Sequence, residues 1–140
     1  MSTLSLADAL DTVTAALALP EDEAPLDDAL QLAVAIERIA LEAGAESATR
    51  VLEALILEEF KTLTWRPFEG VHLVRSALTV GAFDADVLAN LLVYVNLYYQ
   101  ELDEPVIALR DRLAAGAPVG ELAADFARVL DEAFAEVGAP

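Results

Sequence analysis

Apolar residues return every three or four positions along most of the chain, and this spacing constrains the fold more than any other feature. Near the amino terminus the repeat places four apolar side chains on one helical face: Leu6, Leu10, Val13 and Leu17. Near the carboxyl terminus a longer repeat comprises Leu122, Phe126, Leu130, Phe134 and Val137. The β-branched residues are scattered and do not alternate in short runs, so we predict no strand. The pattern predicts an all-α protein, a compact bundle of about six or seven helices with short loops, spanning residues 1–140 as a single domain.

Capping and helix-breaking residues predict where individual helices begin and end. Ser5 with Asp8 three positions later resembles a capping box, and Asp84 is a suitable N-cap. Gly44 and Gly81 are suitable exits from the preceding helices. The clearest predicted boundaries are 26–43 for the second helix, 71–80 for the fourth and 85–102 for the fifth. Between the third and fourth helices, the residue before Pro67 is expected to be extended.

The balance of charge excludes several classes of partner. The chain has 25 acidic residues, 8 basic residues and a formal net charge of -17. We therefore predict no nucleic-acid binding, which requires clustered Lys and Arg, and no binding to an anionic membrane surface. Hydrophobic residues make up 56% of the chain, too many for a disordered acidic segment, and the absence of cysteine excludes disulfides and thiolate-bound metals. A first segment without a basic leader or a long apolar run predicts a cytoplasmic location, and no stretch is long enough to span a bilayer.

A short basic segment interrupts the acidic sequence. Between Lys61 and Arg75 there are three cations, one acid and the chain's single histidine. One interpretation is a pocket for a carboxylate or phosphate, because arginine forms forked hydrogen bonds with such groups. The candidate ligand-binding residues are Trp65, Arg66, His72 and Arg75. The alternative is that these cations pair with the protein's own carboxylates while the tryptophan belongs to the core.

A dense acidic run precedes the second helix. Glu21, Asp22, Glu23, Asp27 and Asp28 place five acids within eight residues. Carboxylates at a helix start are favoured by the helix dipole, which is a sufficient structural explanation. They also suit a docking surface for a basic protein, because opposite charges accelerate association.

The fifth predicted helix is apolar on nearly every face, which predicts an interface. Tyrosines suit such a surface because each combines a large apolar ring with a polar end. The predicted interface residues are Leu88, Leu91, Tyr94, Val95, Tyr98 and Tyr99. Our first hypothesis is therefore a non-enzymatic acidic interaction or adaptor protein, a homodimer that binds a basic protein partner. It assigns no catalytic residue, no cofactor and no metal.

Two other hypotheses belong to different classes. In the first, Tyr94, Tyr98 and Trp65 line a cavity for an anionic or amphipathic small molecule, and Arg66 or Arg75 holds its charged head.

In the second, carboxylates on helices hold a metal ion. Glu58 and Glu59 resemble part of the Glu-Glu-x-x-Glu pattern of the MazG-like nucleotide pyrophosphohydrolases, although Thr62 replaces the third glutamate. That resemblance implies metal-dependent nucleotide hydrolysis on a helical fold. The further carboxylates that would complete the site are Glu101, Asp103 and Glu104.

Overall fold

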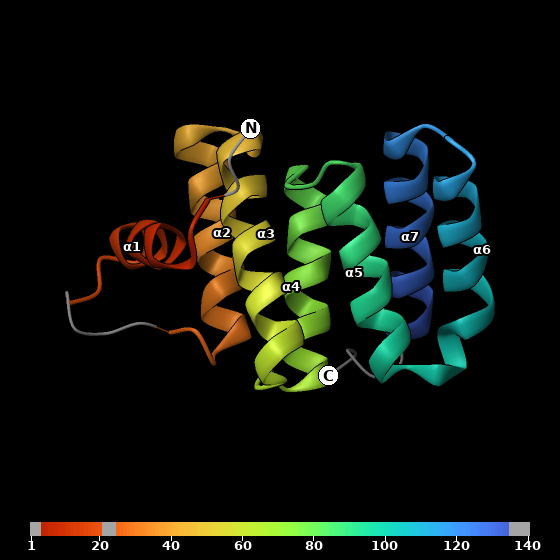
Figure 1. Cartoon of the computed structure of the whole chain (residues 1–140), viewed down its shortest axis with the longest axis horizontal. Helices are drawn as coiled ribbons and strands as arrows, with labels where there is room; N and C mark the ends of the chain where they lie inside the picture. Colours follow the sequence, from red (N-terminus) through yellow and green to blue (C-terminus); the bar gives the residue numbers. More distant parts are fainter. Residues whose placement is uncertain (1–3, 21–24, 135–140) are drawn as a thin grey trace. The chain divides into compact units, whose positions relative to one another are not determined.

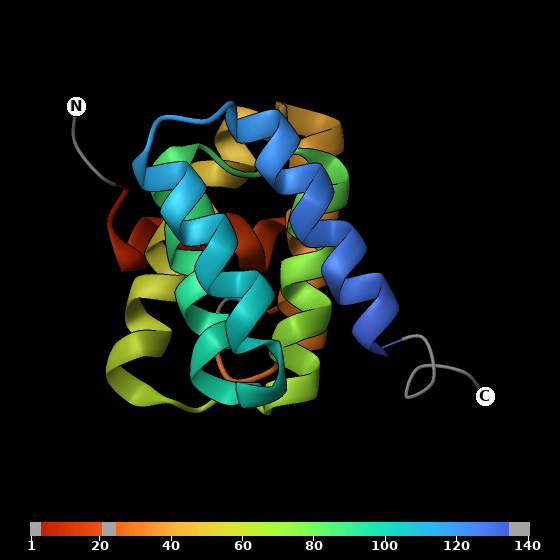
Figure 2. The same ribbon diagram turned by 90° about the vertical axis from the view of Figure 1, so that its right-hand side faces the viewer.

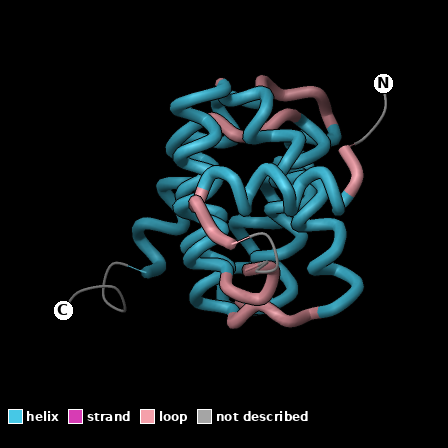
Figure 3. The backbone as a smooth tube through the Cα atoms, turned by 90° about the vertical axis from the view of Figure 1, so that its left-hand side faces the viewer, coloured by secondary structure: helices cyan, strands magenta, loops and turns pink. Residues whose placement is uncertain are grey.

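The computed structural model describes residues 4–20 and 25–134. Within these ranges it contains seven α-helices and one 3-10 turn and no strand, which confirms the all-α prediction (Figure 1). The connections after residue 29 are short (Figure 3), whereas residues 17–28 separate the first two helices. The elements are α1 (Leu6–Ala16), α2 (Ala29–Ala43), α3 (Ala45–Thr62), α4 (Pro67–Val80), α5 (Ala85–Tyr98), η1 (Gln100–Leu102), α6 (Asp103–Ala114) and α7 (Val119–Phe134).

The chain divides into two compact units, residues 1–83 and residues 84–140. In the first unit α2 packs against both α3 and α4, and these three helices run alongside one another (Figure 1). The shorter α1 lies across them and contacts α2 and α3 (Figure 2). The largest fully buried side chains of this unit are Leu32, Ile36, Leu52, Leu55, Ile56 and Leu73. The single domain predicted from the chain length stays a prediction.

Side-chain caps begin three of the helices. The Ser5 hydroxyl accepts a hydrogen bond from the Asp8 amide at 3.1 Å, and Asp84 accepts one from the Val87 amide at 2.9 Å, so both predicted caps are confirmed. Asp28 accepts one from the Gln31 amide at 3.2 Å. The prediction that the second helix begins near residue 26 is wrong by about one turn, because Asp28 is its cap and not a residue of its first turn.

A single glycine joins α2 to α3. Gly44 has φ 100 and ψ 157, a combination that residues with a Cβ adopt only under strain. It ends the first helix and precedes the second, so the two can pack side by side with no longer loop. Gly81, with φ 76, ends α4 in the left-handed conformation. The glycine exit predicted at Gly81 is confirmed; Gly44 ends α2 as predicted, but its ψ lies outside the left-handed helical region that the prediction assumed.

The fourth helix begins four residues before its predicted start. Arg66 is extended, as expected for a residue that precedes proline, but Pro67 is the first helical residue instead of part of a loop. Proline suits this position because a helix leaves its first amides without partners in any case. The Gly70 amide then donates to the Arg66 carbonyl at 2.8 Å to close the first turn.

In the second unit α6 packs against α5 and α7. The predicted fifth helix is shorter than expected: it ends at Tyr98, and Tyr99, with φ -131 and ψ 80, turns the chain into η1. The amphipathic pattern of the last helix is confirmed as far as Phe134, and Val137 lies outside the described residues. No helix in the described part of the chain is both long and apolar enough to cross a membrane.

Candidate functional site

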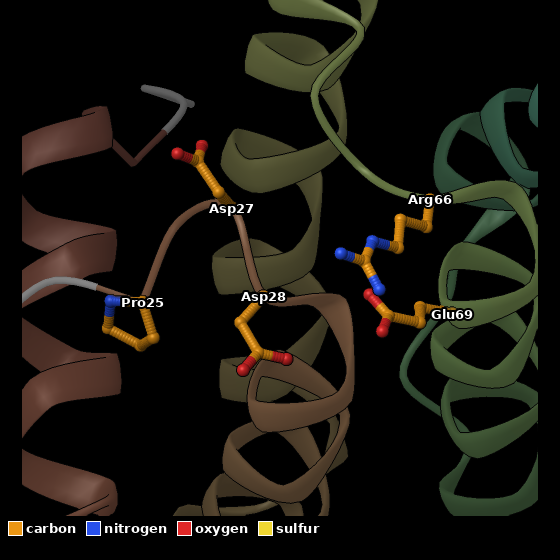
Figure 4. Close-up of a pocket in the computed structure, with 5 residues that line it drawn as sticks. All are labelled: Pro25, Asp27, Asp28, Arg66 and Glu69. Atoms are coloured by element: carbon orange, nitrogen blue, oxygen red, sulfur yellow. The ribbon is translucent and has the colours of Figure 1, made fainter.

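The first unit carries an open pocket where the start of α2 faces the start of α4. Its volume is about 370 Å³. The residues that line it, all drawn in Figure 4, are Pro25, Asp27, Asp28, Arg66 and Glu69. Hereafter this is the acidic pocket.

Trp65 joins the two sides of the acidic pocket. Its ring is buried, with an exposed fraction of 3%, and its indole Nε1 donates a hydrogen bond to the Leu26 carbonyl at 2.8 Å. Leu26 lies between Pro25 and Asp27, whereas Trp65 directly precedes Arg66. One partly buried hydrogen bond therefore positions residues that are far apart in the sequence on opposite sides of the same opening.

A buried carboxylate holds the loop that carries Arg66. Glu59 is 1% exposed, and its Oε2 accepts a hydrogen bond from the Trp65 amide at 2.9 Å. Its Oε1 accepts from the Thr64 amide at 3.0 Å and from the Thr64 hydroxyl at 3.1 Å. Several donors can stabilise a carboxylate away from water. Glu59 thus orders the α3–α4 loop at the point where Leu63 adopts the left-handed conformation with φ 51.

The acidic pocket has an excess of negative charge. Figure 4 shows the guanidinium of Arg66 and the carboxylate of Glu69 pointing toward each other. Asp27 and Asp28 come from the segment on the other side. Three carboxylates and one guanidinium therefore line the pocket, a net charge of -2 when all are ionised. Such a lining favours a cationic group over an anion, because the anion would meet more repulsion than attraction.

The structure does not bring the four predicted ligand-binding residues together. Trp65 belongs to the core, and Arg66 alone of the four lines the acidic pocket. His72 is exposed and Arg75 half-buried on α4, and neither lines the acidic pocket. Arg66 therefore lines the pocket beside Glu69, with neither His72 nor Arg75 next to it.

The acidic run before the second helix contributes the opposite side of the pocket. Asp27 and Asp28 line it, whereas Glu21, Asp22 and Glu23 lie outside the described residues. The density of acids in the sequence was the available signal for these two aspartates. No comparable signal pointed to Glu69, because its position depends on the packing of α4 against α2.

The side chains predicted to form a dimer interface are largely inside the single chain. Four of them have an exposed fraction of 0%: Leu88, Leu91, Tyr94 and Val95. Tyr98 and Tyr99 are half-buried. The four buried side chains offer no surface in this structure, and the homodimer stays a prediction.

The two half-buried tyrosines contact other aromatic rings. The ring of Tyr98 lies with its centroid 5.0 Å from that of Tyr94, and the ring of Tyr99 meets Phe134 edge-on at 4.9 Å. Burial, with the negative charge of Glu101 adding to it, raises the pKa of the Tyr99 phenol. Both side chains therefore take part in packing within the second unit.

Two of the carboxylates of the hydrolase hypothesis make other contacts. Glu59 is occupied by the α3–α4 loop, and Asp103 accepts a hydrogen bond from Asn96. The Asn96 carbonyl oxygen also accepts from Arg110 at 3.3 Å, which links α5 to α6. Within residues 4–20 and 25–134, no group of three or more His, Asp or Glu side chains is arranged to hold a metal ion.

Comparisons of this chain with protein-family models, curated proteins and solved structures each returned no match. We therefore infer function from the geometry and charge of the acidic pocket.

Proposed function

We propose that this chain is a non-enzymatic interaction protein that binds a basic protein partner, and that the acidic pocket receives a Lys or Arg side chain of that partner. The observation that carries the proposal is the three-to-one excess of carboxylates over cations in the pocket. Its position at the surface suits a side chain that arrives from another protein. We also place the protein in the cytoplasm, as predicted from the sequence.

The pocket contributes selectivity and association rate more than affinity. An exposed ion pair contributes only about 0.2–1 kcal/mol, so two or three such pairs do not make a tight complex. The formal charge of -17 attracts a basic partner over a longer range and raises its rate of encounter. The pocket then determines where the cation settles. Arg66 disfavours a second cation beside Glu69 and leaves Asp27 and Asp28 as the preferred partners.

A short lysine-rich peptide with neutral ends tests the proposal. Asp27→Asn together with Asp28→Asn removes two pocket charges, and the asparagine that replaces Asp28 can still cap α2. We expect this double variant to bind the peptide about 2- to 30-fold more weakly at low salt, the range that two exposed pairs represent. Fluorescence anisotropy measures the affinity, which should fall as ionic strength rises.

The matched control is Glu121→Gln with Glu132→Gln, which removes the same charge from exposed positions on α7. Equal weakening of binding in the two double variants would show that net charge alone attracts the peptide and would refute a role for the pocket.

The predicted homodimer does not affect this test, because both sides of the pocket belong to the first unit. Sedimentation velocity tests it.

A further inference from the structure

The outward face of α2 presents a row of apolar side chains. Leu30, Val34 and Leu41 have exposed fractions of 41%, 39% and 87%. Their positions, together with the exposed Glu37, follow the spacing i, i+4, i+7 and i+11, which places all four on one side of the helix. The row is about 16 Å long at the rise of an α-helix. We call these four residues the α2 stripe.

The α2 stripe is the face of the helix that the first unit leaves uncovered. The opposite face carries Leu32, Ile36 and Ile39, which are buried. The neighbouring Arg38 turns toward α1, where its guanidinium donates to the Ala16 carbonyl at 3.2 Å. Single exposed leucines are ordinary on a protein surface. Three apolar residues aligned at the spacing of a coiled-coil seam provide a surface that a second helix can cover.

Glu37 places a carboxylate within the stripe, and further acids lie before and after it in the sequence. Asp27 and Asp28 of the acidic pocket immediately precede α2, Glu37 lies within the row, and the exposed Glu42 follows Leu41. A partner helix lying on this face would meet apolar contacts along the row and the carboxylate of Glu37 near its middle. The complementary surface is an amphipathic helix with apolar residues on one side and Lys or Arg beside them.

We infer that the α2 stripe docks an amphipathic helix of the basic partner, with a Lys or Arg side chain opposite Glu37. The inference rests on the proposed function and deepens it: the acidic pocket holds one cation, and the stripe adds the apolar contact that exposed ion pairs lack. It also restricts the partner to proteins that carry a basic helix with an apolar side. A basic chain without that apolar side would meet only the charges.

A second copy of this chain fits the stripe poorly. Two α2 helices aligned in parallel would place Glu37 opposite Glu37 within the seam. An antiparallel pair would also bring the two carboxylates close, because Glu37 lies near the middle of the row. Repulsion between the two carboxylates opposes association, so the stripe selects a partner of opposite charge.

Three peptides of equal length with neutral ends test this inference on the full chain. The first is an amphipathic helix with leucines at heptad positions and lysines beside them. The second has the same composition in an order that destroys the apolar face, and the third replaces each lysine of the first by glutamate. We expect the first to bind about tenfold more tightly than the second, since only it can bury the stripe, and the third to bind far more weakly than either.

Two single substitutions locate the binding site. We expect Glu37→Lys to lower the affinity for the first peptide by about tenfold or more and to raise the affinity for the third, because the substitution reverses the charge within the stripe. We expect Leu41→Ser to lower the affinity for the first peptide by about fivefold, because the substitution removes an apolar side chain from the docking face. The matched controls are Glu132→Lys on α7 and Leu97→Ser on α5, where the leucine is 53% exposed. Both should bind the first peptide within about twofold of the original chain.

The outcomes separate this inference from the proposed function. If both lysine peptides bind equally and only the Asp27→Asn, Asp28→Asn variant weakens them, the acidic pocket binds basic partners and helix docking is refuted. If neither that variant nor Glu37→Lys changes binding, both proposals fail. If sedimentation velocity shows a dimer that Leu41→Ser dissociates, the stripe joins two copies of this chain and the inference is overturned.

Discussion

Glu59 is the residue whose role differs most between sequence and structure. In the sequence it belongs to a pair of glutamates that suggests metal chemistry. In the structure it is buried and accepts hydrogen bonds from the main chain of Thr64 and Trp65. Its partners lie five and six residues further along the chain, beyond the helix to which it belongs. Their proximity follows from the left-handed turn at Leu63, which no short sequence pattern identifies.

Replacing Glu59 by alanine should destabilise the first unit. The change leaves a buried amide and a neighbouring loop without their acceptor, and we expect the free energy of unfolding to fall by about 2–3 kcal/mol. Glu58→Ala is the matched control. Glu58 is the residue next to Glu59, but it is half-buried and its carboxylate makes no comparable loop contact among the described residues. We expect the control to stay within about 0.5 kcal/mol of the original chain. Urea denaturation measures both, and similar values for the two would contradict the anchoring role.

Asp125 introduces a dependence on pH in the second unit. The hydrogen bond from Arg112, 2.9 Å long, lowers the pKa of the Asp125 carboxyl below its ordinary value of 3.8, and the charge of Arg128 lowers it further. Because folding lowers this pKa, the ionised carboxylate stabilises the folded chain above about pH 4. That contribution is lost as the pH falls through the lower pKa of the folded state.

Asp125→Asn should therefore be less stable than the original chain near neutral pH. The difference in stability should shrink as the pH falls below about 4. There the Asp125 carboxylate of the original chain becomes protonated, so that it is uncharged like the asparagine of the variant. Asp111→Asn, on an exposed position of α6, controls for the removal of one negative charge. Denaturation curves recorded over this pH range give the comparison. A difference that stays constant down to the lowest pH would rule out the titration of Asp125 as its cause.

At the level of helices, local signals predict existence and ends well. Asp84 and Gly81 mark boundaries because capping and positive φ are properties of a few consecutive residues. The predicted boundaries are wrong where packing or loop contacts, and not the local sequence, determine where a helix begins or ends. Pro67 begins α4 close to the loop ordered by Glu59, and α5 ends at Tyr98 although the apolar pattern continues to Leu102.

The glycine between α2 and α3 provides a test at the same scale. Gly44→Ala should destabilise the chain by about 1–3 kcal/mol, because its backbone conformation is strained for any residue with a Cβ. A Cβ at this position meets nothing within 4 Å, so crowding contributes no part of the effect. Gly120→Ala is the matched comparison: it lies within α7, also has free space, and should stabilise the chain by about 0.4–1 kcal/mol. Thermal denaturation that showed equal shifts for both would contradict this explanation.

For the whole molecule, charge and packing determine different things. The formal charge of -17 follows from composition and is the basis of the proposed basic partner. The location of the acidic pocket depends on Trp65, whose indole hydrogen bond to Leu26 joins two segments 39 residues apart. Asp27 and Asp28 could be singled out from the acidic run, but Glu69 reached the pocket only through the packing of α4 on α2.

Composition alone determined that this chain is acidic and free of cysteine. The order of residues determined that it is helical and placed several helix ends correctly, because periodicity and capping act over a few neighbouring positions. Tertiary structure decided which apolar side chains would be covered. It buried Leu88, Leu91, Tyr94 and Val95 and left Leu30, Val34 and Leu41 on the surface. The physical reason is that burial depends on which helices pack together, and packing joins residues that are distant in the sequence.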